Sequence, residues 1–128
     1  MKPLCMAICL LLAAHTASAD VSGAELQKFC AEVQKFADGA DEKTVNGLGF
    51  GYCTGLVDGF RTGYAIGALE MDFAGVSRIC IPPTSTTQQL ALVVLKYLKK
   101  YPEALHARSG DLAYEALLKA FVCTGTKD

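Results

Sequence analysis

The cysteines constrain this chain more than any other feature of its sequence. Four of its six cysteines are spread along the chain beyond the N-terminal region, namely Cys30, Cys53, Cys80 and Cys123. An even number of cysteines in a short exported chain predicts disulfides. The alternative is a zinc site, but these cysteines include no C-x-x-C pair and are widely separated. We therefore expect two disulfides.

The N-terminus has the pattern of a signal peptide. Lys2 gives it a positive start, and residues 4–14 form an apolar run that is too short to cross a bilayer. Residues 17–19 read Ala-Ser-Ala, which is an A-x-A cleavage site. The sequence therefore predicts a signal peptide at residues 1–19 and one domain at residues 20–128, the alternative being a retained N-terminal anchor.

The composition of the mature domain argues against two classes of function. Cleavage would leave 109 of the 128 residues and would remove Lys2 but none of the 13 acidic residues, so the net charge would fall from −1 to −2. A slightly acidic domain lacks the basic footprint of nucleic-acid-binding proteins. No later segment is apolar and long enough to span a membrane. We expect a soluble domain that binds no nucleic acid and no membrane.

Hydrophobic periodicity predicts two helices in the first half of the mature chain. The first covers residues 23–38, begins with an S-x-x-E capping box formed by Ser22 and Glu25, and ends at Gly39. The second covers about residues 44–69.

Two further helices follow in the second half. Ser85 and Gln88 are expected to cap the third helix, and Pro102 ends it. Ser109 is expected to cap the fourth, which runs into Cys123.

Glycine recurs at every fourth position of the second predicted helix. This row, called the glycine stripe below, consists of Gly47, Gly51, Gly55, Gly59, Gly63 and Gly67, and Gly49 is an additional glycine. Each interior glycine weakens a helix by about 1 kcal/mol relative to alanine, so tertiary packing must compensate. We expect the stripe to pack closely, either in the core or against a second copy of the chain.

Hairpin geometry predicts which cysteines pair, because residues equidistant from the turn of an antiparallel hairpin lie side by side. The midpoint between Cys30 and Cys53 falls in the turn after the first helix, and that between Cys80 and Cys123 falls where the third helix ends. Of the three possible connectivities, we predict Cys30–Cys53 and Cys80–Cys123. The predicted fold is all-α, a small four-helix domain of two disulfide-stapled helical hairpins.

The sequence contains no constellation that indicates catalysis. His106 is the only histidine after the predicted signal peptide, and its place between two helices suggests that it bonds to nearby backbone. With the cysteines in disulfides, no nucleophile and base pair stands out. The glycines do not follow the phosphate-binding pattern G-x-x-x-x-G-K-[ST], and none of the many possible acid pairs is distinguished. We expect no enzyme, no cofactor and no metal.

Three stretches nevertheless form a familiar pattern. Residues 52–59 read YCTGLVDG, residues 80–82 read CIP before the third helix, and residues 96–123 contain Lys-Tyr-Leu, Tyr-Pro-Glu-Ala-Leu-His, Glu-Ala-Leu and Ala-Phe-Val-Cys. Together they resemble the Rap/Tai family of type VI secretion immunity proteins. The chain departs from the family at residues 83–86, where an acidic residue, glycine, valine and threonine are usual, and at Val122, where proline is usual.

The resemblance implies a location and a partner. Such proteins are periplasmic, often homodimeric, and bind a cognate peptidoglycan amidase effector, whose active-site cleft they block with a protruding loop. The competing hypothesis is a general periplasmic stress protein or acid chaperone of the HdeA kind, which would need apolar surface released at low pH.

We place the partner-binding surface in the loop predicted at residues 70–78. Two acids stand beside two large apolar residues at Glu70, Met71, Asp72 and Phe73, a combination that can present an apolar anchor within a polar rim. The alternative is that the two apolar side chains fold back onto the core.

Overall fold

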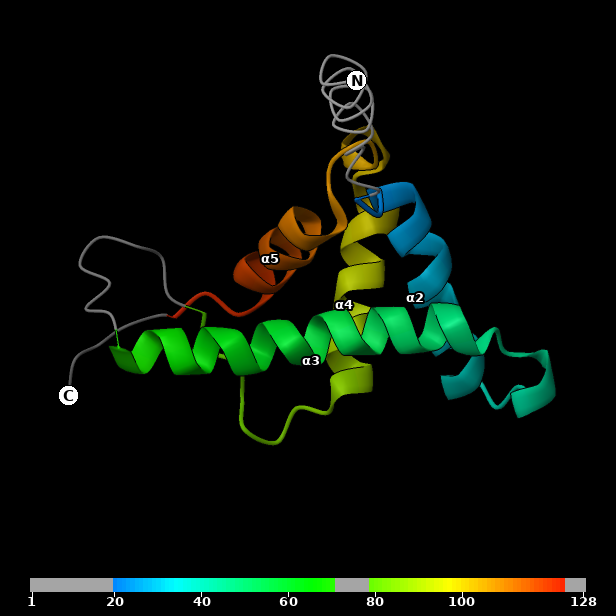
Figure 1. Ribbon diagram of the computed structural model, residues 1–128, viewed down its shortest axis with the longest axis horizontal. Helices are drawn as coiled ribbons and strands as arrows, with labels where there is room; N and C mark the ends of the chain where they lie inside the picture. Colours follow the sequence, from blue (N-terminus) through cyan, green and yellow to red (C-terminus); the bar gives the residue numbers. More distant parts are fainter. Residues whose placement is uncertain (1–19, 71–78, 124–128) are drawn as a thin grey trace, which may run out of the picture.

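The computed structural model describes residues 20–70 and 79–123, and within them the fold is all-α, as predicted (Figure 1). Beyond the helices, it contains only isolated β-bridges in these ranges. The helices, labelled as in Figure 1, are α2 (Gly23–Ala37), α3 (Gly47–Glu70), α4 (Thr87–Lys100) and α5 (Ser109–Ala120), with short 3-10 helices at Glu42–Thr44 and Pro102–Ala104.

Two of the predicted features lie wholly or partly outside the described residues. The expected signal peptide at residues 1–19 is one of them. Of the predicted binding loop, Glu70 is the last residue of α3, whereas Met71, Asp72 and Phe73 fall in the range that is not described.

The first predicted helix is confirmed at both ends. The Ser22 hydroxyl accepts a hydrogen bond from the Glu25 backbone N–H, and the Glu25 carboxylate accepts one from the Ser22 backbone N–H at 3.0 Å, which completes the capping box. Helix α2 ends at Ala37, and Gly39 follows with a φ of 87°. Glycine reaches this left-handed conformation without steric cost, so it terminates the helix and starts the turn.

Helix α4 begins one residue later than predicted. Thr86 and Gln89, rather than Ser85 and Gln88, form its capping box. The prediction was wrong because both register positions offer a hydroxyl followed three residues later by glutamine. Ser85 is held in the preceding turn, where its backbone N–H donates to the Pro82 carbonyl at 3.0 Å.

Ser109 does not cap α5, contrary to the prediction. It is the first helical residue, and Arg108 occupies the capping position, where its side chain makes no capping hydrogen bond. The Ser109 side chain is buried and its hydroxyl lies 3.0 Å from the Tyr52 hydroxyl of α3. The Ser109 hydroxyl therefore links α5 to α3 instead of capping α5. Helix α5 also ends at Ala120 rather than continuing to Cys123.

Helix α4 is the centre of the hydrophobic core. It packs against α2, α3 and α5, and Figure 1 shows α3 lying across α2 and α4. The buried core residues are Leu26, Cys30 and Val33 of α2, Cys53 and Val57 of α3, Leu90, Ala91, Val94, Leu95, Tyr97 and Leu98 of α4, and Leu112, Ala113, Ala116 and Leu117 of α5.

Both predicted disulfides are confirmed. Cys30–Cys53 joins α2 to α3 inside the core, with a Cα–Cα distance of 5.2 Å. Cys80–Cys123 joins the segments before α4 and after α5, where the Cys80 backbone N–H also donates to the Phe121 carbonyl at 2.7 Å. Each disulfide thus joins two segments that the chain already brings together.

Among the described residues, nothing packs against the glycine stripe, and in this respect the expectation of close packing within the chain was wrong. A Cβ atom added at any of its six positions would meet, within 4 Å, no described atom beyond its neighbours in the helix. The opposite side of α3 carries Cys53 and Val57 and is buried. Only Gly49, which lies off the stripe, is in close contact, since its Cβ would lie 3.1 Å from Phe29 Cδ1 and 3.3 Å from Phe29 Cα.

Candidate partner-binding surface

The connection between α2 and α3 forms a well-ordered hairpin tip at one end of the domain. We use the name hairpin tip for residues 36–50, which include the end of α2, the 3-10 helix Glu42–Thr44 and the start of α3. Figure 1 shows this segment extending beyond the other helices. The Cys30–Cys53 disulfide fastens the two helices at its base.

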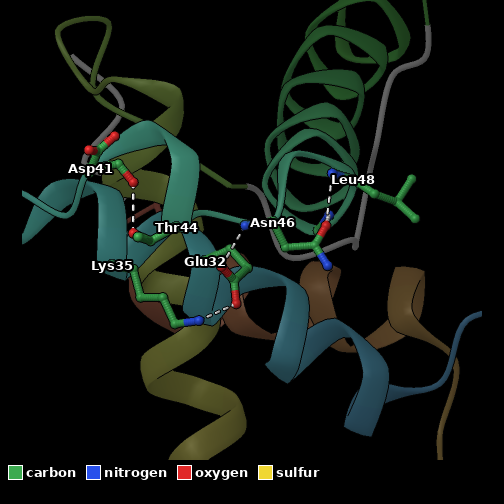
Figure 2. Close-up of polar contacts among 7 residues, drawn as sticks. Glu32, Lys35, Asp41, Thr44, Asn46 and Leu48 are labelled. Atoms are coloured by element: carbon green, nitrogen blue, oxygen red, sulfur yellow. Dashed lines mark hydrogen bonds and ion pairs between the residues drawn. The ribbon is translucent and has the colours of Figure 1, made fainter.

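Local side-chain hydrogen bonds hold the tip. The Asp41 carboxylate accepts from the Lys43 backbone N–H at 3.0 Å, and the Asp41 carbonyl accepts from both the N–H and the hydroxyl of Thr44, at 2.8 and 2.7 Å (Figure 2). Asp41 therefore caps the 3-10 helix and closes the turn.

Asn46 starts α3. Its side-chain carbonyl accepts from the backbone N–H groups of Leu48 and Gly49, at 3.0 and 3.2 Å, as an N-cap residue does. Two of the N–H groups that a helix leaves unpaired at its first turn are thus satisfied.

Glu32 of α2 ties this start of α3 to the preceding helix. One carboxylate oxygen accepts from the Lys35 ammonium at 2.6 Å, and the other accepts from the Asn46 backbone N–H at 2.9 Å (Figure 2). These two bonds, that of Lys35 first, lower the pKa of Glu32 because both favour the ionised carboxylate. The charged form of Glu32 therefore fixes the tip at neutral pH.

The tip also exposes apolar side chains. Leu48 is 75% exposed and Phe36 is 38% exposed, although both are large and apolar, and in Figure 2 the Leu48 side chain projects away from the hydrogen-bonded residues. A hollow of about 320 Å³ lies beside them, lined by Phe36, Glu42, Val45, Gly47, Phe50 and Gln88. The hairpin tip therefore presents apolar side chains on a backbone that hydrogen bonds already hold in place.

The other residues considered in the sequence carry no sign of chemistry. His106 behaves as predicted, since its Nδ1 lies 3.0 Å from the Glu103 carbonyl oxygen. Among residues 20–70 and 79–123, no three metal-ligating side chains come together. No helix in this part of the chain is both long and apolar enough to cross a membrane. The predicted partner-binding residues Met71, Asp72 and Phe73 are not described, so the structure does not bring them into a site.

Sequence reasoning missed the hairpin tip as a candidate surface. Leu48 and Phe50 lie within the second predicted helix, and the sequence alone did not show that Leu48 would be exposed. The capping residues Asp41 and Asn46 were a usable signal, because aspartate and asparagine between two helices favour ordered turns.

These features define a class of protein, a small all-α domain stapled by two disulfides, with an exposed apolar surface on a hydrogen-bonded hairpin tip. Disulfides of this kind are typical of an oxidising compartment. The family model of the Rap1a immunity proteins matches residues 22–123, and the chain belongs to this family. No curated protein and no solved structure matches the chain.

The family match confirms the resemblance seen in the sequence and gives it a function. The matched residues include all four disulfide-bonded cysteines and all four α-helices. Membership indicates an immunity function and therefore binding to a cognate effector.

Proposed function

We propose that this chain is a periplasmic immunity protein that binds a secreted peptidoglycan amidase and blocks its active-site cleft without catalysing a reaction. The family match over residues 22–123 is the observation that carries the proposal. The predicted signal peptide at residues 1–19 and the two disulfides support export to the periplasm.

The hairpin tip is suited to the inhibitory contact. A segment that enters a cleft loses conformational freedom, and this loss is smaller when hydrogen bonds and a disulfide have already fixed the segment. Leu48 supplies an exposed apolar anchor, and the same tip carries the exposed charged residues Glu42 and Lys43. Buried apolar anchors within a polar rim contribute most of the affinity of protein interfaces.

The loop predicted from the sequence remains a second contact in this proposal. Met71 and Phe73 offer apolar groups beside Glu70 and Asp72. The loop follows the C-terminal end of α3, whereas the hairpin tip precedes and includes its N-terminal end. The two surfaces can therefore be tested separately by substitutions.

A pull-down of the tagged, disulfide-bonded domain against an amidase-like product encoded beside it tests the proposal. We expect a stable complex that abolishes peptidoglycan cleavage. Failure of any such product to bind, together with protection of unrelated proteins from acid aggregation, would favour the stress-protein hypothesis instead.

Substitutions then assign the surface. We expect Leu48→Ala to weaken the complex at least tenfold, and Ile66→Ala to leave it unchanged. Ile66 is a matched control because it is 55% exposed on the same helix, away from the tip. The double substitution Asp72→Ala and Phe73→Ala tests the loop in the same assay. A complex that tolerates both sets of changes would contradict both surfaces.

A further inference from the structure

A second surface, on α4 and α5, gathers lysines over aromatic rings. A hollow of about 230 Å³ is lined by Val93, Lys96, Tyr97, Lys100, Tyr101, Ala116, Lys119 and Ala120. We call it the basic hollow. It shares no residue with the hairpin tip, and it occurs in a chain whose net charge is slightly negative.

The lysines of the hollow come from two helices and converge on the tyrosines. The Lys119 ammonium lies 5.0 Å from the centre of the Tyr97 ring and 4.6 Å from that of Tyr101, and the Lys100 ammonium lies 5.2 Å from the Tyr101 ring. These are cation–π distances. The two tyrosine rings thus form the base of the hollow, and lysine ammonium groups lie close to them.

Within the described residues, Lys96, Lys100 and Lys119 form no salt bridge, and all three are exposed. The Lys119 ammonium also lies 3.5 Å from the Tyr97 hydroxyl, to which it can donate. The nearby Glu115 carboxylate accepts the Tyr97 hydroxyl at 2.6 Å and does not line the hollow. The hydrogen bond to Glu115, and then burial, raise the pKa of Tyr97, so its hydroxyl remains a neutral donor.

Helix dipoles explain only part of this arrangement. Cations near the C-terminal ends of helices are favoured, which accounts for Lys100 and Lys119 one helix at a time. Lys96 and Lys100, however, stand four residues apart on one helix, where like charges repel. The dipoles also do not account for the convergence of lysines from two helices on a shared pair of rings.

We propose that the basic hollow binds an acidic segment of a partner protein. Carboxylates of the segment lie against the three ammonium groups, and its apolar atoms rest on the tyrosine rings, Val93 and the two alanines. An apolar floor within a charged rim is the usual anatomy of a protein interface. The volume is below that of typical small-molecule pockets, which suits one or two side chains of a larger partner.

Compact anions are less suited to this surface. The hollow lies beside the last turns of α4 and α5, whose dipoles present their negative ends there. It contains no arginine, the residue whose planar group binds phosphate in bidentate fashion. Carboxylates spread along a segment can each meet a different exposed ammonium group, whereas a single compact anion cannot.

A fluorescent peptide of alternating glutamate and leucine provides the probe, with the glutamine analogue as its control. We expect the mature domain to bind the glutamate peptide at least tenfold more tightly than the analogue, with affinity falling as salt rises. The double variant Lys96→Gln and Lys119→Gln is expected to lose this preference. Lys28→Gln with Arg108→Gln changes the net charge equally at exposed positions outside both the hollow and the hairpin tip and is expected to retain it.

Three results would overturn the proposal. The first is equal binding of the two peptides by the mature domain. The second is equal loss of binding in both double variants, which would reduce the effect to net charge. The third is tighter binding of tripolyphosphate or of a heparin oligosaccharide than of the peptide, at the same lysines, which would assign the hollow to phosphate or to an anionic glycan. None of these results bears on whether the domain inhibits an amidase.

Discussion

The open face of α3 leads to a prediction whose sign is unusual, because replacing two glycines of the regularly spaced stripe should stabilise the protein. In the variant Gly55→Ala with Gly59→Ala, each new Cβ meets no other atom within 4 Å. Alanine in a helix interior is favoured over glycine by about 0.5–1 kcal/mol, chiefly because the unfolded chain loses freedom. The two changes should therefore raise the free energy of unfolding by about 1–2 kcal/mol.

Urea unfolding followed by far-ultraviolet circular dichroism measures this change, with the disulfides intact. In a domain of about 100 residues, 1 kcal/mol corresponds to about 4–8 °C in the melting temperature, so a thermal scan gives an independent estimate. The m-value should stay the same if only the helix backbone is affected.

Gly49→Ala is the matched control on the same helix. Its Cβ would lie 3.1 Å from Phe29 Cδ1, 3.2 Å from Glu32 Cγ and 3.3 Å from Phe29 Cα. Such contacts force the neighbouring helix to shift, and overpacking of this kind costs about 1–3 kcal/mol. We expect a net destabilisation of about 1 kcal/mol, opposite in sign to the double variant.

Destabilisation by Gly55→Ala with Gly59→Ala would refute this reasoning. It would mean that something covers the stripe in the folded protein. If the midpoint of the parent protein also rose with protein concentration, the covering surface would be a second copy of the chain, the possible homodimer expected from the family resemblance.

Three further predictions concern the parts that hold the fold. Replacing Cys30 and Cys53 by alanine should lower the free energy of unfolding by about 3.5 kcal/mol, from the loop closed by their separation of 23 residues; an unchanged urea midpoint would contradict this. At pH values above the ordinary carboxyl pKa of 4.5, Glu32→Gln should lower the melting temperature. The difference from the parent protein should disappear as the pH falls through the lowered pKa of Glu32. A difference that does not depend on pH would exclude the charge of Glu32 as its cause. Leu98→Ala should cost about 2–5 kcal/mol because Leu98, in the last turn of α4, is fully buried in the core, and a loss below about 1 kcal/mol in urea would show that the core closes over the gap.

The elements that sequence predicted well are those fixed by local chemistry. The Ser22 and Glu25 capping box, the stop at Gly39 and the two disulfides depend on neighbouring residues or on hairpin geometry. The start of α4 was displaced by one residue because Ser85 and Thr86 are each followed three residues later by glutamine, which repeats the same capping pattern. The local sequence does not distinguish between these two equivalent caps. The preceding turn, which holds Ser85, determines that Thr86 is the N-cap residue.

The exposed surfaces depend on contacts between residues that are far apart in the sequence. On a helix, Gly51 and Gly55 lie nearly opposite Cys53, so the sequence already placed the glycine stripe away from the disulfide, but not whether anything covers it. The basic hollow escaped prediction because Lys119 meets Tyr97 only once α5 packs on α4. The hydrophobic period of a sequence identifies the buried face of a single helix. It does not show which exposed residues of two different helices will lie close together.

The disulfides divide the covalent chain into two closed rings in tandem. One ring spans residues 30–53 and the other residues 80–123, and neither encloses or threads the other. A cut between them would release two fragments with no covalent link, whereas a cut within either ring would leave the chain connected. Cysteines paired in consecutive order also require no exchange of partners. If the chain is exported from its N-terminal end, as proposed, the first ring can close before the cysteines of the second have arrived.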